Sequence, residues 1–399
     1  MALLNLSDFQ KPDNPIAKFY SKFYVSKNIL LTGHSHQAWP DCSLRGQIEA
    51  WNDAACLKDE KWEKAFQIAD EVKKKFAQLI NDKEGLYTLG ESVHHLLCRL
   101  LSCYSRDSQK LKIITTGGEF HSARRQLNRL SEVGVDIHWI PIDPFSSFVE
   151  RFLEAIDSQT SIVLLSKVLF ESGRVIQRMD EVADRCLKKQ ADLVVDIYHA
   201  LNVIDFDLKK EGLQHAYLLG GGYKYLQLGE GNCFLRRPSS CDKKPLLTGW
   251  FSEISRIGQS RKEGEPVFYP EGASRFDGST YDVTSHYRAK SVFDFFIEHS
   301  LSPALLSQVN MWQKKTMLEE FYTSNFSSKV LSFDEKLEGV GGFLSFKTPY
   351  AKEISSQLKK EYIFTDYRGD YLRLGPAPYL SEQQLRKGVD CMKKAALKV

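Results

Sequence analysis

Short apolar runs rich in β-branched residues alternate with helical patterns through the middle of this 399-residue chain. The expected strands cover residues 111–116, 135–140, 161–166, 192–196, 216–219 and 232–235. Helical patterns such as 148–156 and 179–190 lie between them. Strands that alternate with helices are typical of a mostly parallel sheet between two layers of helices. We therefore expect an α/β fold.

The pattern changes after about residue 266. A segment with glycine and serine, 269–280, precedes a long helical stretch over about 282–299, and the remainder includes a strand-like run at 371–374. We expect an N-terminal segment (1–45) that packs with a small domain, a large domain (46–282) and the small C-terminal α/β domain itself (283–399). A chain of this length with 42% hydrophobic residues can bury both cores.

Composition excludes several classes of function. The net charge is +3 and the basic residues are scattered, so nucleic acid is not an expected partner. No stretch approaches the roughly 18 uncharged apolar residues of a membrane span, and the start lacks a secretory leader pattern. Eight cysteines without a Cys-x-x-Cys pair indicate reduced thiols, and the histidines suggest no metal site. We expect a soluble cytoplasmic protein without a membrane partner.

Two charged residues follow neighbouring predicted strands. Asp196 ends one strand, and Lys224 follows the triple glycine after the next strand. Ligands of open parallel sheets bind at the carboxyl ends of strands, where these side chains would meet. An acid that keeps a pyridine nitrogen protonated and a lysine that binds an aldehyde are what pyridoxal phosphate (PLP) requires. With His199 three residues after the acid, order and spacing predict a PLP site.

Each residue alone has an ordinary explanation. An acid ends many buried strands, and a lysine beside glycines is common. The glycine stretch 220–222 lacks the Gly-Lys-Ser/Thr ending of a nucleotide loop, so it does not favour ATP.

Three further segments could complete the site. Glu91 and Ser92 precede an apolar helix, whose free N–H groups and Ser hydroxyl suit a phosphate; a plain N-cap is the alternative. Phe120 follows another predicted strand and could stack on a pyridine ring. Arg373 lies in an apolar strand, where its planar fork suits an α-carboxylate. The alternative for Arg373 is a pair with a surface acid.

Several ordered motifs resemble a known family. They are Asp196-Ile-Tyr-His199-Ala, Tyr223-Lys224-Tyr225-Leu226 and Gly249-Trp250-Phe251, supported by Glu119-Phe120-His121-Ser122, by 272–276 with Ser279-Thr280, and by 373–378. From about residue 31 to 379 the chain resembles the fold-type I PLP enzymes of the class V aminotransferase group, and within it most the kynureninases. The resemblance implies a seven-stranded type of sheet and a homodimer whose two sites are completed by both chains.

The resemblance also implies roles for individual residues. Lys224 would bind the cofactor and move the α-proton, and Asp196 would pair with the pyridine nitrogen close to His199. The ring would stack on Phe120. The phosphate would be held by Ser92 and Tyr223, with Trp250 and Ser279 or Thr280 from the other subunit, and Glu91 would be a further cofactor contact. Arg373 would bind the substrate carboxylate.

The chain departs from the family in the segments that contact the substrate. Residues 33–37 are Gly-His-Ser-His-Gln, where the family has a segment like Gly-Asn-Ser-Leu-Gly, so His34 and Ser35 become candidates for substrate contacts. Thr280 replaces an Asn that reads the aryl ketone of kynurenine. The His-Gly segment expected near residues 51–62 is not recognisable.

The leading hypothesis is a PLP-dependent hydrolase that cleaves the Cβ–Cγ bond of kynurenine or 3-hydroxykynurenine, giving alanine and an anthranilate. An aminotransferase or lyase acting on another amino acid is the alternative. A cysteine desulfurase needs a mobile cysteine near the substrate, and residues 365–369 contain none. A non-catalytic binding module would require neither Lys224 nor Asp196.

Overall fold

The computed structural model describes residues 3–104, 111–260, 262–323 and 330–399. Residues 1 and 2 of the expected N-terminal segment therefore lie outside it. The centre is a seven-stranded sheet of order β2-β8-β7-β6-β5-β3-β4. Its strands are β2 (Leu86–Gly90), β3 (Lys112–Thr116), β4 (Asp136–Ile140), β5 (Ile162–Ser166), β6 (Asp192–Asp196), β7 (Tyr217–Gly221) and β8 (Cys233–Arg237). Only β8 runs against its neighbours, so the expected mostly parallel α/β sheet is confirmed.

The six expected strands all form, and the sequence missed the seventh. No strand is expected at residues 86–90, yet they form the edge strand β2, which pairs with β8. Strand β8 also continues to Arg237, because its two arginines are buried within the fold. Arg236 forms an ion pair with Asp82 at 2.8 Å, which offsets the cost of burying its charge.

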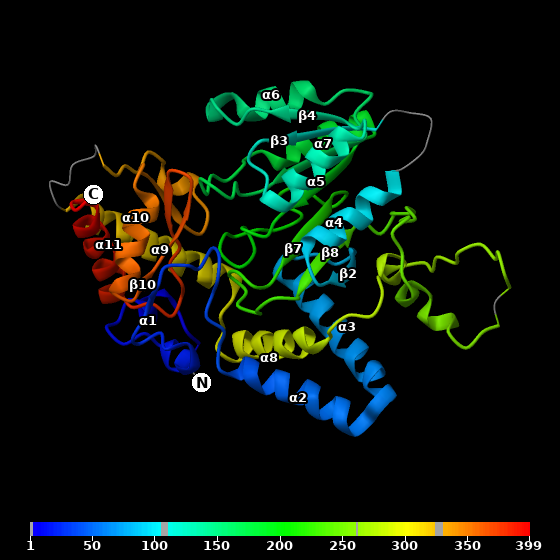
Figure 1. Cartoon of the computed structure of the whole chain (residues 1–399), viewed down its shortest axis with the longest axis horizontal. Coiled ribbons are helices and arrows are strands. Elements are labelled where there is room, and N and C mark those ends of the chain that lie inside the picture. Colours follow the sequence, from blue (N-terminus) through cyan, green and yellow to red (C-terminus); the bar gives the residue numbers. More distant parts are fainter. Residues whose placement is uncertain (1–2, 105–110, 261, 324–329) are drawn as a thin grey trace.

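Helices cover both faces of the sheet, because successive strand residues point to opposite sides. Leu164 and Val194 face a cluster that includes α4 (Val93–Leu101) and α5 (His121–Glu132). Val163, Leu165 and Val195 face the larger cluster, to which α6 (Phe148–Ala155), α7 (Met179–Lys189) and α3 (Lys61–Leu79) contribute. Figure 1 shows these layers around the central strands.

The C-terminal part builds a second, smaller sheet of β11 (Asp366–Arg368), β12 (Tyr371–Leu374) and β9 (Leu344–Lys347). Helices α9 (Pro303–Tyr322), α10 (Ala351–Lys360) and α11 (Glu382–Ala396) accompany it. The expected helix at 282–299 is α8 (Thr284–Glu298), which packs against α2 (Cys42–Leu57).

The N-terminal segment lies beside this C-terminal part (Figure 1). It begins with the short helix α1 (Leu6–Phe9), and β1 (Ile29–Leu30) pairs in parallel with β10 (Ile363–Phe364). Thr32 forms a further bridge to Gly375. The boundaries at 45 and 282 stay predictions. Within the described ranges no helix is long and apolar enough to cross a membrane.

Candidate functional site

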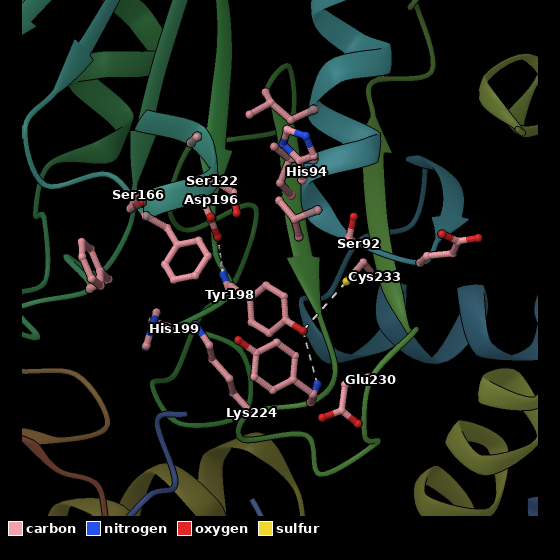
Figure 2. Close-up of a pocket in the computed structure, with 18 of the residues that line it drawn as sticks. Ser92, His94, Ser122, Ser166, Asp196, Tyr198, His199, Lys224, Glu230 and Cys233 are labelled. Carbon is pink, nitrogen blue, oxygen red and sulfur yellow. Dashed lines mark hydrogen bonds between the residues drawn. The ribbon is translucent and has the colours of Figure 1, made fainter. Parts of the chain in front are cut away.

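A cavity of about 270 Å³ opens where β5 and β6 end. The predicted residues that line it are Glu91, Ser92, Phe120, Asp196, His199, Tyr223 and Lys224. Figure 2 shows that they come from the ends of several strands and from the start of α4. The structure thus brings together seven residues that the sequence proposed for one cofactor. Their individual roles stay predictions.

Lys224 is the buried amine of this cavity. Its Nζ lies 2.6 Å from Nε2 of His199, and the side chain reaches it from the turn after β7. Burial lowers the pKa of Lys224 to about 7; the Asp196 carboxylate opposes this shift and the Arg373 charge adds to it. A large fraction of the amine is therefore neutral at neutral pH, and a neutral amine is the form that attacks an aldehyde.

Asp196 and His199 flank the lysine with unlike charge states. Burial raises the pKa of Asp196, while its Oδ1 accepts a hydrogen bond from the Tyr198 backbone N–H at 2.8 Å. Burial lowers the pKa of His199 well below its ordinary value, so this imidazole is neutral. Its Nδ1 has no hydrogen-bond partner among the described residues. The cavity therefore offers an acid for a pyridine nitrogen and a neutral imidazole beside the amine.

The opposite end of the cavity is the start of α4. Ser92 is the N-cap, and its hydroxyl accepts a hydrogen bond from the His95 backbone N–H at 3.2 Å. The ordinary capping role that the sequence allowed is thus present. The other N–H groups of this first turn have no helical acceptor, which suits an anion. Glu91 is exposed and pairs with the His95 ring at 3.4 Å.

Aromatic rings surround the amine between these two ends. Lys224 Nζ lies 5.3 Å from the ring centroid of Phe120, 4.7 Å from that of Tyr198 and 5.6 Å from that of Tyr223. Burial raises the pKa of Tyr223 to about 12, so its phenol keeps its proton at neutral pH. The lysine, the acid, the ring wall and the helix start together fit PLP.

Arg373 lies outside this cavity and is already paired. Its Nη2 contacts the Asp366 carboxylate, and its Nη1 donates to the backbone oxygen of Phe170. The alternative weighed for Arg373, a pair with an acid, is therefore present, with a mostly buried acid rather than a surface one. His34 Nε2 lies 3.6 Å from the same carboxylate. Ser35 donates its hydroxyl to Thr32 O at 3.2 Å and does not line the cavity.

Trp250, Ser279 and Thr280 are close to one another but not to Lys224. Trp250 Nε1 donates to Thr280 Oγ1 at 3.0 Å, and Ser279 and Thr280 are exposed. None of the three lines the cavity of this chain. Figure 1 shows their segment, in yellow-green, projecting from the body of the molecule. A role at the phosphate requires a second subunit and stays a prediction.

Two buried acids near the site were not singled out from the sequence. Glu119 accepts hydrogen bonds from Thr116 Oγ1 at 2.8 Å and from Ser166 Oγ at 2.7 Å, and burial raises its pKa to about 7. Asp366 lies directly opposite Arg373 in the β11–β12 pair. The hairpin spacing around Gly369 was the signal for that pairing.

Comparisons with known proteins show what this chain is similar to. Residues 57–221 match the family Aminotransferase class-V. An uncharacterized aminotransferase of Bacillus subtilis, YcbU, is 23% identical over 346 residues, covering 86% of this chain and 88% of that protein. A kynureninase of Pseudomonas fluorescens is 22% identical over 380 residues, covering 88% and 85%.

A similar solved structure is an apo cysteine desulfurase from Thermococcus onnurineus, with a TM-score of 0.80 and 15% identity over the whole of both chains. At this identity the likeness shows the fold, and the fold is that of type I PLP enzymes. The family match over residues 57–221 and the fold together indicate a PLP-dependent enzyme that is similar to the class V aminotransferases over that part of the chain.

Proposed function

We propose that this enzyme hydrolyses the Cβ–Cγ bond of kynurenine or 3-hydroxykynurenine, releasing alanine and an anthranilate. The observation that carries the proposal is the cavity in which Lys224, with a pKa of about 7, lies among Phe120, Tyr198 and Tyr223. An amine of this kind is suited to abstract an α-proton, and aromatic walls suit an aryl ketone. The likeness to a kynureninase over most of both chains supports the same substrate class.

Bound PLP supplies an electron sink for charge at the α-carbon. The side chains of this protein transfer the protons and bind the substrate. Lys224 takes the α-proton once its amine is neutral. Tyr223, whose pKa of about 12 keeps it protonated at neutral pH, donates its proton to Cβ as the Cβ–Cγ bond breaks and water adds to the γ-ketone. Arg373 binds the α-carboxylate.

His34 is the proposed replacement for substrate contacts that the family makes with other residues. It is buried, and its ring stacks on Phe343 with centroids 4.6 Å apart. Burial lowers its pKa to about 3, so the imidazole is neutral and can donate or accept a hydrogen bond. His36, in contrast, has an exposed side chain and lies 3.9 Å from Glu230.

We also propose a homodimer. Trp250, Ser279 and Thr280 are partly or fully exposed on the projecting segment, where a second chain could place them against its neighbour's α4 start. Sedimentation of the PLP-loaded protein tests the assembly. Trp250→Ala should weaken PLP binding if the segment completes the partner's site, and should leave PLP binding unchanged if it does not.

An aminotransferase is the second candidate, favoured by the likeness to the Bacillus subtilis protein. A desulfurase is disfavoured. Cys233 alone of the eight cysteines lines the cavity, and burial raises its pKa to about 12, so it is not the mobile nucleophile that persulfide chemistry needs.

The deciding experiment adds kynurenine and 3-hydroxykynurenine in turn to PLP-loaded protein and follows anthranilate fluorescence. Catalytic growth of that signal supports the hydrolase. No product with either substrate, but conversion of another amino acid only when a keto acid is added, would replace it with the aminotransferase.

A further inference from the structure

Groups of the same chain pair with some, but not all, of the N–H donors of the Arg373 guanidinium. Nη1 donates to Phe170 O and Nη2 contacts Asp366, while Nε has no hydrogen-bond partner among the residues described. The residue is only 3% exposed. Leaving a buried donor unpaired is unfavourable, because no hydrogen bond compensates for its lost hydration. This edge of the guanidinium is therefore suited to a further acceptor.

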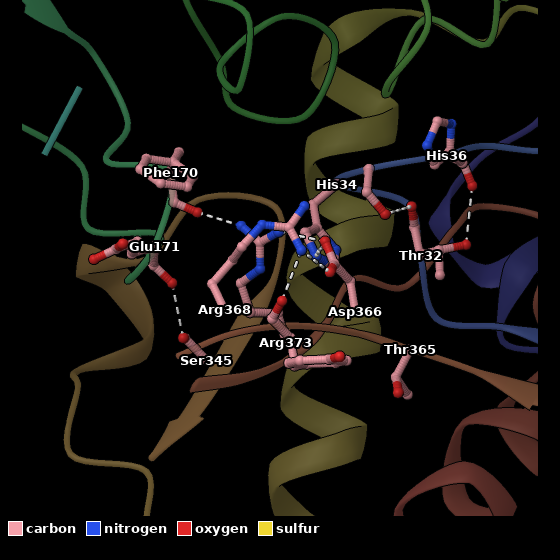
Figure 3. A network of polar contacts seen from close by, with 12 residues as sticks. Thr32, His34, His36, Phe170, Glu171, Ser345, Thr365, Asp366, Arg368 and Arg373 are labelled. Atoms are coloured by element: carbon pink, nitrogen blue, oxygen red, sulfur yellow. Dashed lines mark hydrogen bonds and ion pairs between the residues drawn. The ribbon is translucent and has the colours of Figure 1, made fainter. Parts of the chain in front are cut away.

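Asp366 lies between two arginines. Its Oδ1 accepts a hydrogen bond from Arg368 Nη1 at 2.6 Å, and its Oδ2 contacts Arg373. His34, which is neutral, lies beside the same carboxylate (Figure 3). Two arginines and one acid leave a single positive charge, which matches one incoming carboxylate.

Arg373 lies outside the cavity but is hydrogen-bonded to a residue of its wall. Phe170, whose backbone oxygen accepts from Arg373, also lines the cavity that contains Lys224. The charge of Arg373 contributes to the lowered pKa values of Lys224 and His199, and the charge of Arg368 reaches Tyr223. A ligand held by Arg373 would thus be in electrostatic contact with the amine.

We propose that Asp366 is a specificity-determining residue that takes the place of the substrate carboxylate on Arg373 until an amino acid displaces it. This rests on the proposed function only in taking Arg373 as the carboxylate site. After displacement Asp366 stays paired with Arg368, whose charge remains neutralised. A second carboxylate then finds no free cation and meets the negative charge of Asp366. The site therefore selects against amino acids that carry a second carboxylate.

A purely orienting role for Asp366 predicts the opposite effect of removing its charge. If Asp366 only holds Arg373 in position, Asp366→Asn loosens the arginine and weakens every carboxylate ligand. If Asp366 competes with the ligand, Asp366→Asn frees the arginine and strengthens binding. The sign of one measured change separates the two roles.

The experiment is calorimetric titration of L-alanine and L-aspartate into the wild type and variants, all incubated with PLP. Asp366→Asn should bind alanine about tenfold more tightly, as expected for losing a buried charged competitor. Its preference for alanine over aspartate should fall by at least as much. Arg373→Gln should lose binding of both ligands.

Two further variants keep the result interpretable. Arg368→Gln removes the other partner of Asp366, so Asp366 should bind Arg373 more firmly and alanine should bind more weakly. Asp157→Asn is the matched control, since Asp157 pairs with Lys112 at 2.7 Å and does not line the cavity. It should leave both titrations unchanged.

Unchanged or weaker alanine binding in a folded Asp366→Asn protein would overturn the proposal, and so would retained alanine binding in Arg373→Gln. Failure of the proposed function gives a different pattern. Kynurenine would then yield no anthranilate, while the alanine titrations would still shift as stated.

Discussion

Two buried lysines in different parts of this chain share a lowered pKa but not the same surroundings. Burial lowers the pKa of Lys224, after β7, and of Lys314, in α9, to about 7. Lys314 Nζ donates to the backbone oxygens of Val340 and Gly341. Lys224 Nζ instead contacts His199 and lines a cavity. A low pKa therefore does not identify a reactive amine unless open space and an approaching electrophile accompany it.

The largest expected difference between the two lysines is that only Lys224 forms a covalent bond with PLP. Lys224→Ala should remove the borohydride-reducible bond between protein and PLP, because Lys224 is the lysine among the described residues that lines the cavity. Intact-protein mass after reduction measures this. Wild-type protein treated in parallel is the control, and an equal mass increase in the variant would place the cofactor on another lysine.

The second difference is the acid beside the amine. Asp196 is the main opposing charge at Lys224, whereas the charge that opposes the shift at Lys314 is that of Glu338. Asp196→Asn removes a charged hydrogen-bond partner worth about 1.5–3 kcal/mol, so PLP should bind roughly 10–100-fold more weakly. Absorbance titration with PLP measures the affinity. Asp157→Asn is the control, and unchanged affinity in Asp196→Asn would remove Asp196 from the pyridine nitrogen.

The pKa of Lys224 itself can be read from kinetics. A folded pKa of about 7 means that the neutral amine is scarce at pH 6 and dominant at pH 8. The rate of PLP attachment should rise about tenfold between these values and then level off. Nα-acetyl-lysine, whose ordinary pKa is about 10.4, should continue to accelerate above pH 8. A protein profile that climbs in the same way would mean that burial does not lower this pKa.

The smallest effect on chemistry is expected at the other lysine. Lys314→Met should leave PLP attachment intact, but it leaves the oxygens of Val340 and Gly341 without their donor. We expect a loss of about 2 kcal/mol in the free energy of unfolding, measured by urea titration. The neighbouring exposed Lys315→Met is the matched control and should change neither. Loss of attachment in folded Lys314→Met would end the distinction between the two lysines.

The cofactor half of the site could be predicted from the sequence because it depends on local rules. Asp196, Phe120 and Lys224 each follow a strand that hydrophobic pattern identifies, and a parallel sheet brings strand ends together. Edge strand β2 was missed because Leu86–Gly90 is short, polar in part and ends in glycine. Such a segment looks like a turn until its pairing with β8 is known.

The proposed substrate-binding residues depend on strand pairings that the hydrophobic pattern does not reveal. His34 and Arg373 meet only because Thr32 bridges Gly375 and β1 pairs with β10. Asp366, the acid that pairs with Arg373, belongs to the neighbouring strand of a small hairpin. The register of the β11–β12 pair places it opposite the arginine. Trp250 and Thr280 contact each other but do not line the cavity, so the role that we propose for them needs a second chain.

The pairing of β1 with β10 also sets an order of events during translation. Lys224 and His199 belong to the middle of the chain, whereas the partners of residues 29–32 are residues 363–375. A ribosome has therefore made the cofactor-binding sheet before it makes the strand that anchors the N-terminal segment. His34 can be fixed beside Arg373 only once nearly the whole polypeptide has emerged, so a truncated product would contain Lys224 without the arginine that we propose binds the substrate carboxylate.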